Sequence, residues 1–265
     1  MRIASLGHAV FAATLIAIGL LGFIKPDYAA IWDGIPKAFP ARAALPYLCA
    51  LVALGCGLGL LWPRSAAVAA RVLLAYLLAW MLVFKGRFIV LAPLQEGSYQ
   101  SAGENAVVVA GAWVLYAWLA GDWDRRQLGF AVGDKGVRIA RAFYGLAMLA
   151  FGFSHFAYLD LTAPLIPAWI PGHVFWAYFT GTAYLAAGAA ILSGVFARLA
   201  ALLSALQMAG FLLLVWLPLV LAAKMSDFNW GEVVVNCALV AGAWLVVDSY
   251  RGTPRLSRPA MLSRP

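Results

Sequence analysis

Long apolar runs alternate along the whole chain with short segments that are charged or rich in proline. Eight of these runs are long enough to cross a bilayer, which takes about 20 mostly apolar residues at about 1.5 Å of rise each. The predicted spans are residues 5–24, 44–62, 66–91, 104–121, 137–158, 173–193, 197–223 and 231–248. The pattern therefore predicts an all-α integral membrane protein.

The composition agrees with an integral membrane protein and excludes several other classes of protein. Hydrophobic residues make up 65% of the chain and charged residues 11%, whereas soluble domains carry about 25% charged residues. This excludes a soluble globular domain and a disordered chain, and three cysteines are too few for a disulfide framework. The net charge is +8, but Lys and Arg are scattered between apolar runs. The expected partner is therefore the lipid bilayer and not a nucleic acid.

The distribution of Lys and Arg predicts the orientation. Counted over alternate loops, 13 fall on one side of the predicted bundle and 6 on the other. Positive residues accumulate on the cytoplasmic side, so an even number of spans places both termini in the cytoplasm. A chain in which the fourth or the eighth run does not cross is the alternative.

An internal duplication organises the chain. The pentapeptide Val-Ala-Gly-Ala-Trp occurs at 109–113 and again at 240–244, an offset of 131 residues. At the same offset Ile35, Pro36, Pro40, Tyr47, Leu54, Gly57, Leu61 and Asn105 align with Ile166, Pro167, Pro171, Tyr178, Leu185, Gly188, Leu192 and Asn236. With a shift of two residues, Gly19, Phe23 and Asp27 align with Gly152, Phe156 and Asp160. The first run thus has a transmembrane counterpart, and we predict that it is a retained span and not a cleaved signal peptide.

The duplication predicts the domain organisation. Residues 1–121 form the first four-helix repeat and residues 137–250 the second, with a charged cytoplasmic linker at 122–136 and a basic cytoplasmic tail at 251–265. Because each copy has an even number of spans, both copies enter and leave on the same side. The expected architecture is eight transmembrane helices as two parallel-repeat four-helix bundles, related by an axis along the membrane normal.

The second copy carries a set of motifs that resembles a known family. It contains Gly-Phe-Ser-His-Phe at 152–156 and Ile-Pro-Ala-Trp-Ile-Pro-Gly-His at 166–173, followed by Trp176, Tyr178, Thr180, Gly181, Gly188 and Arg198. Over 137–248 the chain resembles the DoxX family of four-span bacterial membrane proteins. Over 1–121 the resemblance is weaker, since Gly22 stands in the place of His155.

The resemblance implies a location in the bacterial inner membrane but no single reaction. One implied function is a redox-associated membrane component that exchanges electrons with a quinone or a thiol partner; the cofactor stays open, with quinone as one candidate. The alternative is a non-enzymatic carrier or assembly factor for a lipid, a small molecule or a partner protein. A purely structural subunit is a third reading, and whether the protein is an enzyme stays open.

Ionisable residues in or near membrane spans are costly and so mark candidate sites. The predicted topology gathers many of them at the outer face, where we expect a pocket. The candidate pocket residues are His155, Asp160, His173, Lys85, Arg87 and Glu232. His155 is the sharpest candidate, because its imidazole could bind a quinone or exchange a proton with Asp160 or His173 as partner. A core histidine bonded to a backbone carbonyl is the alternative. No further ligand spacing supports haem, and no cluster of Cys and His has metal-ligand spacing.

Three amides are expected between helices. Asn105 and Asn236 occupy equivalent positions of the two copies, and Gln207 lies in the middle of the seventh run. Polar side chains inside a bundle commonly hydrogen-bond between helices, so we predict a packing role for all three.

Lys85 and Arg87 stand apart because the second copy has Trp216 and Pro218 in their places. They are expected either to bind an anionic head group or substrate, or to extend to the outer interface while their stems stay in the apolar region.

Overall fold

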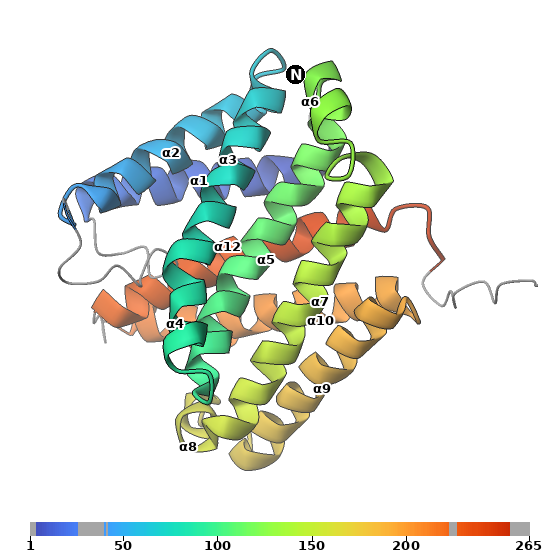
Figure 1. Ribbon diagram of the computed structural model, residues 1–265. Helices are drawn as coiled ribbons and strands as arrows, with labels where there is room; N and C mark the ends of the chain where they lie inside the picture. The colour runs from blue at the N-terminus through green and yellow to red at the C-terminus, as the bar shows by residue number, and fades with distance from the viewer. Residues whose placement is uncertain (1–3, 26–39, 41, 223–226, 255–265) are drawn as a thin grey trace, which may run out of the picture.

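The computed structural model describes residues 4–25, 40, 42–222 and 227–254, and over these ranges the chain forms helices and no strand (Figure 1). The helices are α1 (Leu6–Ile24), α2 (Leu45–Leu61), α3 (Ala66–Trp80), α4 (Gly86–Leu91), α5 (Glu96–Leu119), α6 (Asp122–Gln127), α7 (Gly133–Ala157), α8 (Leu159–Thr162), α9 (His173–Ser193), α10 (Ala197–Phe211), α11 (Leu217–Leu221) and α12 (Asp227–Ser249). A 3-10 turn, η4 (Ala163–Leu165), follows α8. Two π-helical segments, η3 (Met81–Lys85) and η5 (Leu212–Trp216), join α3 to α4 and α10 to α11.

Within the described ranges, seven helices are long and apolar enough to cross a membrane: Leu6–Ile24, Ala66–Leu91, Glu96–Leu119, Gly133–Ala157, His173–Ser193, Ala197–Leu221 and Trp230–Ser249. The fourth and eighth predicted runs are both among them. The helix that falls short is α2, which has 17 residues. The protein is thus an all-helical multi-pass membrane protein.

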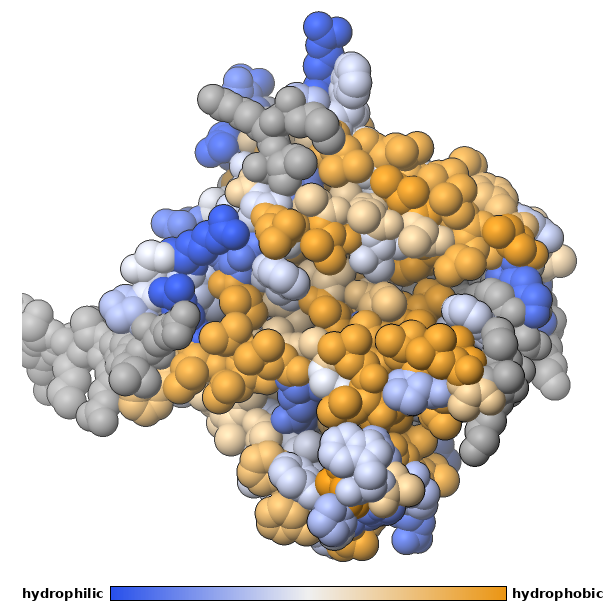
Figure 2. Space-filling model, turned by 180° about the vertical axis from the view of Figure 1, so that it is seen from behind, coloured by the Kyte–Doolittle hydropathy of each residue, from blue (hydrophilic) through white to orange (hydrophobic). Residues whose placement is uncertain are grey.

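The outer surface of the helices is apolar, as a lipid environment requires. Large side chains such as Leu82 and Val90 are 70% and 79% exposed. Figure 2 shows that hydrophobic residues cover most of the face seen from behind, with hydrophilic residues gathered toward its margins. In water such a surface would drive aggregation, whereas in a bilayer it contacts the acyl chains.

The largest difference from the predicted boundaries is at α5. This helix begins at Glu96 and not at residue 104, because its polar first turns are packed inside the protein. Ser98 is buried, and a Cβ on Gly103 would lie 3.3 Å from the side chains of Ala150 and Phe151 on α7. Tertiary contacts therefore keep a polar segment helical that hydropathy alone assigns to a loop.

Helix α5 is the centre of the fold. It packs against α3, α7 and α12, and α12 crosses behind it in Figure 1. At the crossing a Cβ on Gly111 would lie 2.7 Å from the Cα of Gly242, so the two backbones touch. Small residues permit such close approach between membrane helices. Around this centre α1 packs on α2 and α12, and α7 packs on α9.

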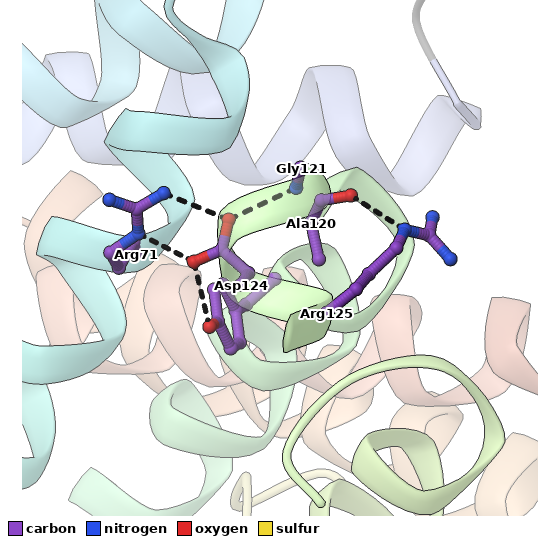
Figure 3. Close-up of polar contacts among 6 residues, drawn as sticks. Arg71, Ala120, Gly121, Asp124 and Arg125 are labelled. Atoms are coloured by element: carbon purple, nitrogen blue, oxygen red, sulfur yellow. Dashed lines mark hydrogen bonds and ion pairs between the residues drawn. The ribbon is translucent and has the colours of Figure 1, made fainter. Parts of the chain in front are cut away.

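The predicted linker 122–136 contains α6, which is anchored through a buried carboxylate (Figure 3). Asp124 is 0% exposed and accepts hydrogen bonds from Arg71 Nε at 2.6 Å and Nη2 at 2.8 Å. It also accepts from the Tyr116 hydroxyl at 2.9 Å and the Gly121 amide at 3.0 Å. The hydrogen-bonded guanidinium of Arg71, aided by these donors, lowers the pKa of the Asp124 carboxyl.

Two regions discussed from the sequence lie outside the described residues. They are positions 27, 35 and 36 of the aligned repeat and residues 255–265 of the basic tail.

Candidate functional site

A cavity of about 310 Å³ opens among α5, α7, α9, α10 and α12, beside the turn formed by α8 and η4. Its lining residues are Gln100, Glu104, Phe151, Ser154, His155, Tyr158, Leu161, Thr162, Leu165, Ile166, Thr180, Tyr184, Met208, Phe211, Val215, Trp216, Glu232, Asn236 and Leu239. All but Gln100 and Glu104 belong to the predicted second repeat. The cavity lies within that unit, with α5 of the first unit closing one side.

His155 is the lining residue whose hydrogen bonding is most informative. Its Nδ1 lies 2.8 Å from the carbonyl oxygen of Phe151, one turn earlier on α7. Because a carbonyl oxygen only accepts, Nδ1 carries the hydrogen and donates it. In the neutral ring, Nε2 then has a lone pair and no hydrogen. Within the described part of the chain no side chain or backbone group bonds to this nitrogen, so it is available to a ligand as an acceptor.

Aromatic rings form the wall beside His155. The imidazole stacks on Phe211, with 5.8 Å between ring centroids, and meets the edge of Tyr184 at 5.6 Å. Tyr184 in turn contacts Phe151 at 5.7 Å and Phe211 at 6.1 Å. These rings come from α7, α9 and α10, so three helices fix the orientation of the imidazole, and their faces offer an apolar surface to a flat ligand.

The opposite wall is polar. Glu104 of α5 and Glu232 of α12 line the cavity together with Gln100 and Asn236. The lining residues include no Lys or Arg, among those that the structure describes. Ser154, next to His155, donates to the Glu96 carboxylate at the start of α5 and to the Ala150 carbonyl at 3.1 Å. The charged groups that line the cavity are therefore carboxylates, which accept hydrogen bonds.

The structure brings together only part of the predicted outer-face cluster. His155 and Glu232 line the cavity, whereas Asp160, Arg87 and His173 do not. Asp160 and Arg87 are exposed, and His173 is half-buried in the first turn of α9. The partner of His155 is the Phe151 carbonyl, as the alternative of a histidine bonded to a backbone carbonyl predicts, and neither Asp160 nor His173. Lys85 lies elsewhere, beside Ser101.

The three predicted interhelical amides have different outcomes. Gln207 of α10 donates to the Thr180 carbonyl of α9 at 3.0 Å, which confirms its expected role. Asn236 donates at 2.9 Å to the Glu232 carbonyl of its own helix, a local bond that short polar side chains often prefer. Asn105 has no hydrogen-bond partner among the described residues. For Asn105 and Asn236 the predicted bonds between helices are therefore not formed there.

The aromatic wall and the contribution of α5 were not predicted from the sequence. Tyr184 and Phe211 have the spacing of ordinary core residues, and Glu104 opens the predicted span 104–121, where a carboxylate is common at a helix N-terminus. One signal for the site is structural, since Val215 and Trp216 lie in the π-helical segment η5. Such segments recur at functional sites, but hydropathy does not reveal them.

The described residues contain no group of three or more His, Cys, Asp or Glu that could hold a metal ion. The fold and the cavity define a polytopic helical membrane protein with a partly aromatic internal pocket. No family model, no curated protein and no solved structure matches the chain.

Proposed function

We propose that the protein binds a small lipophilic molecule in this cavity, as a membrane-embedded carrier or binding protein. The ligand we expect has a flat ring and at least one hydroxyl or N–H group. The observation that carries the proposal is the hydrogen bonding of His155, which leaves Nε2 as an acceptor at an aromatic wall.

The dimensions and chemistry of the cavity suit such a ligand. Small-molecule sites usually have volumes of about 300–1,000 Å³, mostly apolar walls and a few polar groups that orient the ligand. The cavity of about 310 Å³ is at the lower end of this range. The rings of Tyr184 and Phe211 would contact the ligand face, and Nε2 of His155 would accept its hydrogen bond. A ligand hydroxyl or N–H group that is buried without an acceptor is costly, so the ligand must place this group against Nε2 of His155.

The same geometry favours the carrier over a quinone-reducing site. A quinone carbonyl needs a hydrogen-bond donor, and neutral His155 already uses its only N–H on Phe151. A quinol, the reduced and hydroxyl-bearing form, would satisfy the acceptor. A redox-associated function therefore remains compatible with the site only if the protein binds a quinol.

We further propose that the protein has eight spans, with α2 as the eighth, built as two parallel DoxX-like repeats. Two observations support the duplication. Gly111 and Gly242, which are equivalent positions, touch each other, as expected for residues close to a two-fold axis between copies. The π-helical segments Met81–Lys85 and Leu212–Trp216 also lie 131 residues apart. The Lys and Arg distribution supports cytoplasmic termini, and the family resemblance supports a bacterial inner membrane.

A matched pair of probes tests the binding proposal. 1-Naphthol carries a hydroxyl donor, and 1-methoxynaphthalene has the same ring without it. We expect the naphthol to bind about tenfold more tightly, since one net hydrogen bond contributes about 1 to 1.5 kcal/mol. Binding is measured in detergent by quenching of tryptophan fluorescence, because Trp216 lines the cavity.

The variant His155→Phe keeps the ring stacking and removes the acceptor, so it should abolish the preference for the naphthol. His173→Phe is the matched control, since His173 does not line the cavity, and it should leave the preference intact. Equal binding of the two probes to the unaltered protein, or a preference that survives His155→Phe, would overturn the proposal.

A further inference from the structure

Asn105 is a buried polar residue whose side-chain amide makes no hydrogen bond within the described part of the chain. The side chain lies on the central helix α5 and is 0% exposed. Neither its amide nitrogen nor its amide oxygen has a hydrogen-bond partner among the described residues. Buried amides are almost always bonded, and an exception needs a physical explanation. A ligand that accepts from the amide nitrogen supplies one.

Two further polar groups lie on the same side of α5. Lys85, in η3, is 2% exposed, and its Nζ donates to the Ser101 hydroxyl at 2.8 Å. Ser101 and Asn105 are one turn apart and so share a face of α5. An ammonium group buried at membrane depth is costly and typically marks a functional position. Lysine, serine and asparagine side chains can all donate hydrogen bonds to a common acceptor.

The position of this group in the first repeat corresponds to that of the cavity in the second. The residues 131 positions after Lys85, Ser101 and Asn105 are Trp216, Glu232 and Asn236, and all three line the cavity. One ring of the aromatic wall also has a counterpart, because Trp80 corresponds to Phe211; its ring is tilted against that of Phe84, with 4.5 Å between centroids. The inference therefore rests on the tandem repeat of the proposed function.

The charge at the two positions is opposite. Where the second repeat has the carboxylate of Glu232, the first has the Ser101 hydroxyl, and where the second has Trp216, the first has the ammonium of Lys85. An ammonium with nearby hydroxyl and amide donors is suited to a phosphate or carboxylate, because charge-assisted hydrogen bonds are the strong ones. We propose that Lys85, Ser101 and Asn105 form a second binding site, in the first repeat, for an anionic phosphate group.

Lys85 lies close to the end of its helix. Lys85 is followed by α4, which ends at Leu91. At about 1.5 Å per residue this places Lys85 about 9 Å below the helix end. In this proposal a lipid phosphate would approach from this end of the helix, slightly below its usual depth, and a free phosphate would enter from the same side.

The test uses native mass spectrometry of the full chain in mild detergent, titrated separately with inorganic phosphate, phosphatidylglycerol and phosphatidylcholine. We expect one saturable phosphate-bearing adduct on the unaltered protein, and Lys85→Met should weaken it by at least about tenfold. Arg87→Met, two residues away, removes the same charge from an exposed position and should change binding by less than about twofold. Asn105→Leu is the second variant, and it should weaken the same adduct while keeping the volume of the side chain.

The separate titrations with lipid and with inorganic phosphate show whether the bound phosphate belongs to a lipid head group or is a free anion. An adduct with phosphatidylglycerol alone identifies a lipid head group, and an adduct with inorganic phosphate identifies a free anion. No saturable adduct, or equal loss in Lys85→Met and Arg87→Met, overturns the second site. The naphthol assay on the same variants keeps the two proposals distinguishable: Lys85→Met should leave naphthol binding unchanged, and His155→Phe should leave phosphate binding unchanged.

Discussion

Removal of the Arg71 guanidinium should strongly destabilise the protein. Arg71→Met keeps the apolar stem but leaves the Asp124 carboxylate with only the Tyr116 hydroxyl and the Gly121 amide as donors. Loss of one partner of a buried ion pair costs about 3–5 kcal/mol. Because the Arg71 side chain is 34% exposed, water replaces part of the lost interaction, and we expect a decrease of about 3 kcal/mol in the free energy of unfolding.

The assay is unfolding by sodium dodecyl sulfate in mixed micelles, followed by tryptophan fluorescence. Trp123 gives a local signal, since the Arg71 guanidinium lies 4.6 Å from the centroid of its ring. Arg125→Met is the matched control. Arg125 makes a single 3.3 Å bond to the Ala120 carbonyl (Figure 3), so its loss should cost about 0.5 to 1 kcal/mol.

A double-mutant cycle isolates the pair. Adding Asp124→Asn to Arg71→Met removes the uncompensated charge, so the double variant should be more stable than the sum of the two single effects predicts, by about 1–3 kcal/mol. An Arg71→Met variant that costs no more than Arg125→Met, or additive effects of the two substitutions at the pair, would refute a stabilising role of the Arg71–Asp124 pair.

Three other predictions follow from the same structure. The folded-state pKa of Asp124 is lowered, so its stabilisation is complete above its unfolded-state pKa of about 3.9 and is lost as the pH falls below that value and through the lower folded-state pKa; acid titration of the unfolding midpoint should show this, and Asp124→Asn should flatten it. Gly242→Ala should cost about 1–3 kcal/mol because a Cβ there would lie 2.8 Å from a backbone oxygen of α5, whereas Gly210→Ala, which meets nothing within 4 Å, should not destabilise. Single cysteines at Asp160 and Arg126, in a background without the native cysteines, should react with impermeant reagents from opposite sides of the membrane, and labelling from one side would contradict the eight-span arrangement.

The spans with sharp polar boundaries were predictable from the sequence. Residues 66–91 and 173–193 form helices with those limits, because Pro63 and Pro93 flank the first run and Pro171 and Gly194 flank the second. The early start of α5 was not predictable from hydropathy, since contacts with α7 keep its polar turns helical. The π-helical segments were also not predictable, because one extra residue per turn leaves the hydropathy of a long apolar run unchanged.

The site was predictable only where a single residue stands out chemically. His155 and Glu232 could be selected because ionisable groups are rare in spans, and both line the cavity. Tyr184 and Phe211 could not, because an aromatic residue that lines a cavity has the same spacing as one that fills a core. The charged segment around Asp124 resembled a solvated linker, and only the fold shows that its carboxylate is fully buried.

The most direct test of the proposed function is native mass spectrometry of the protein extracted from its membrane, compared with His155→Phe. We expect the unaltered protein to retain a small ring-bearing molecule with a hydroxyl or N–H group, and His155→Phe to lose it. A protein that retains nothing, or a molecule retained equally by both, would contradict a binding site built around His155.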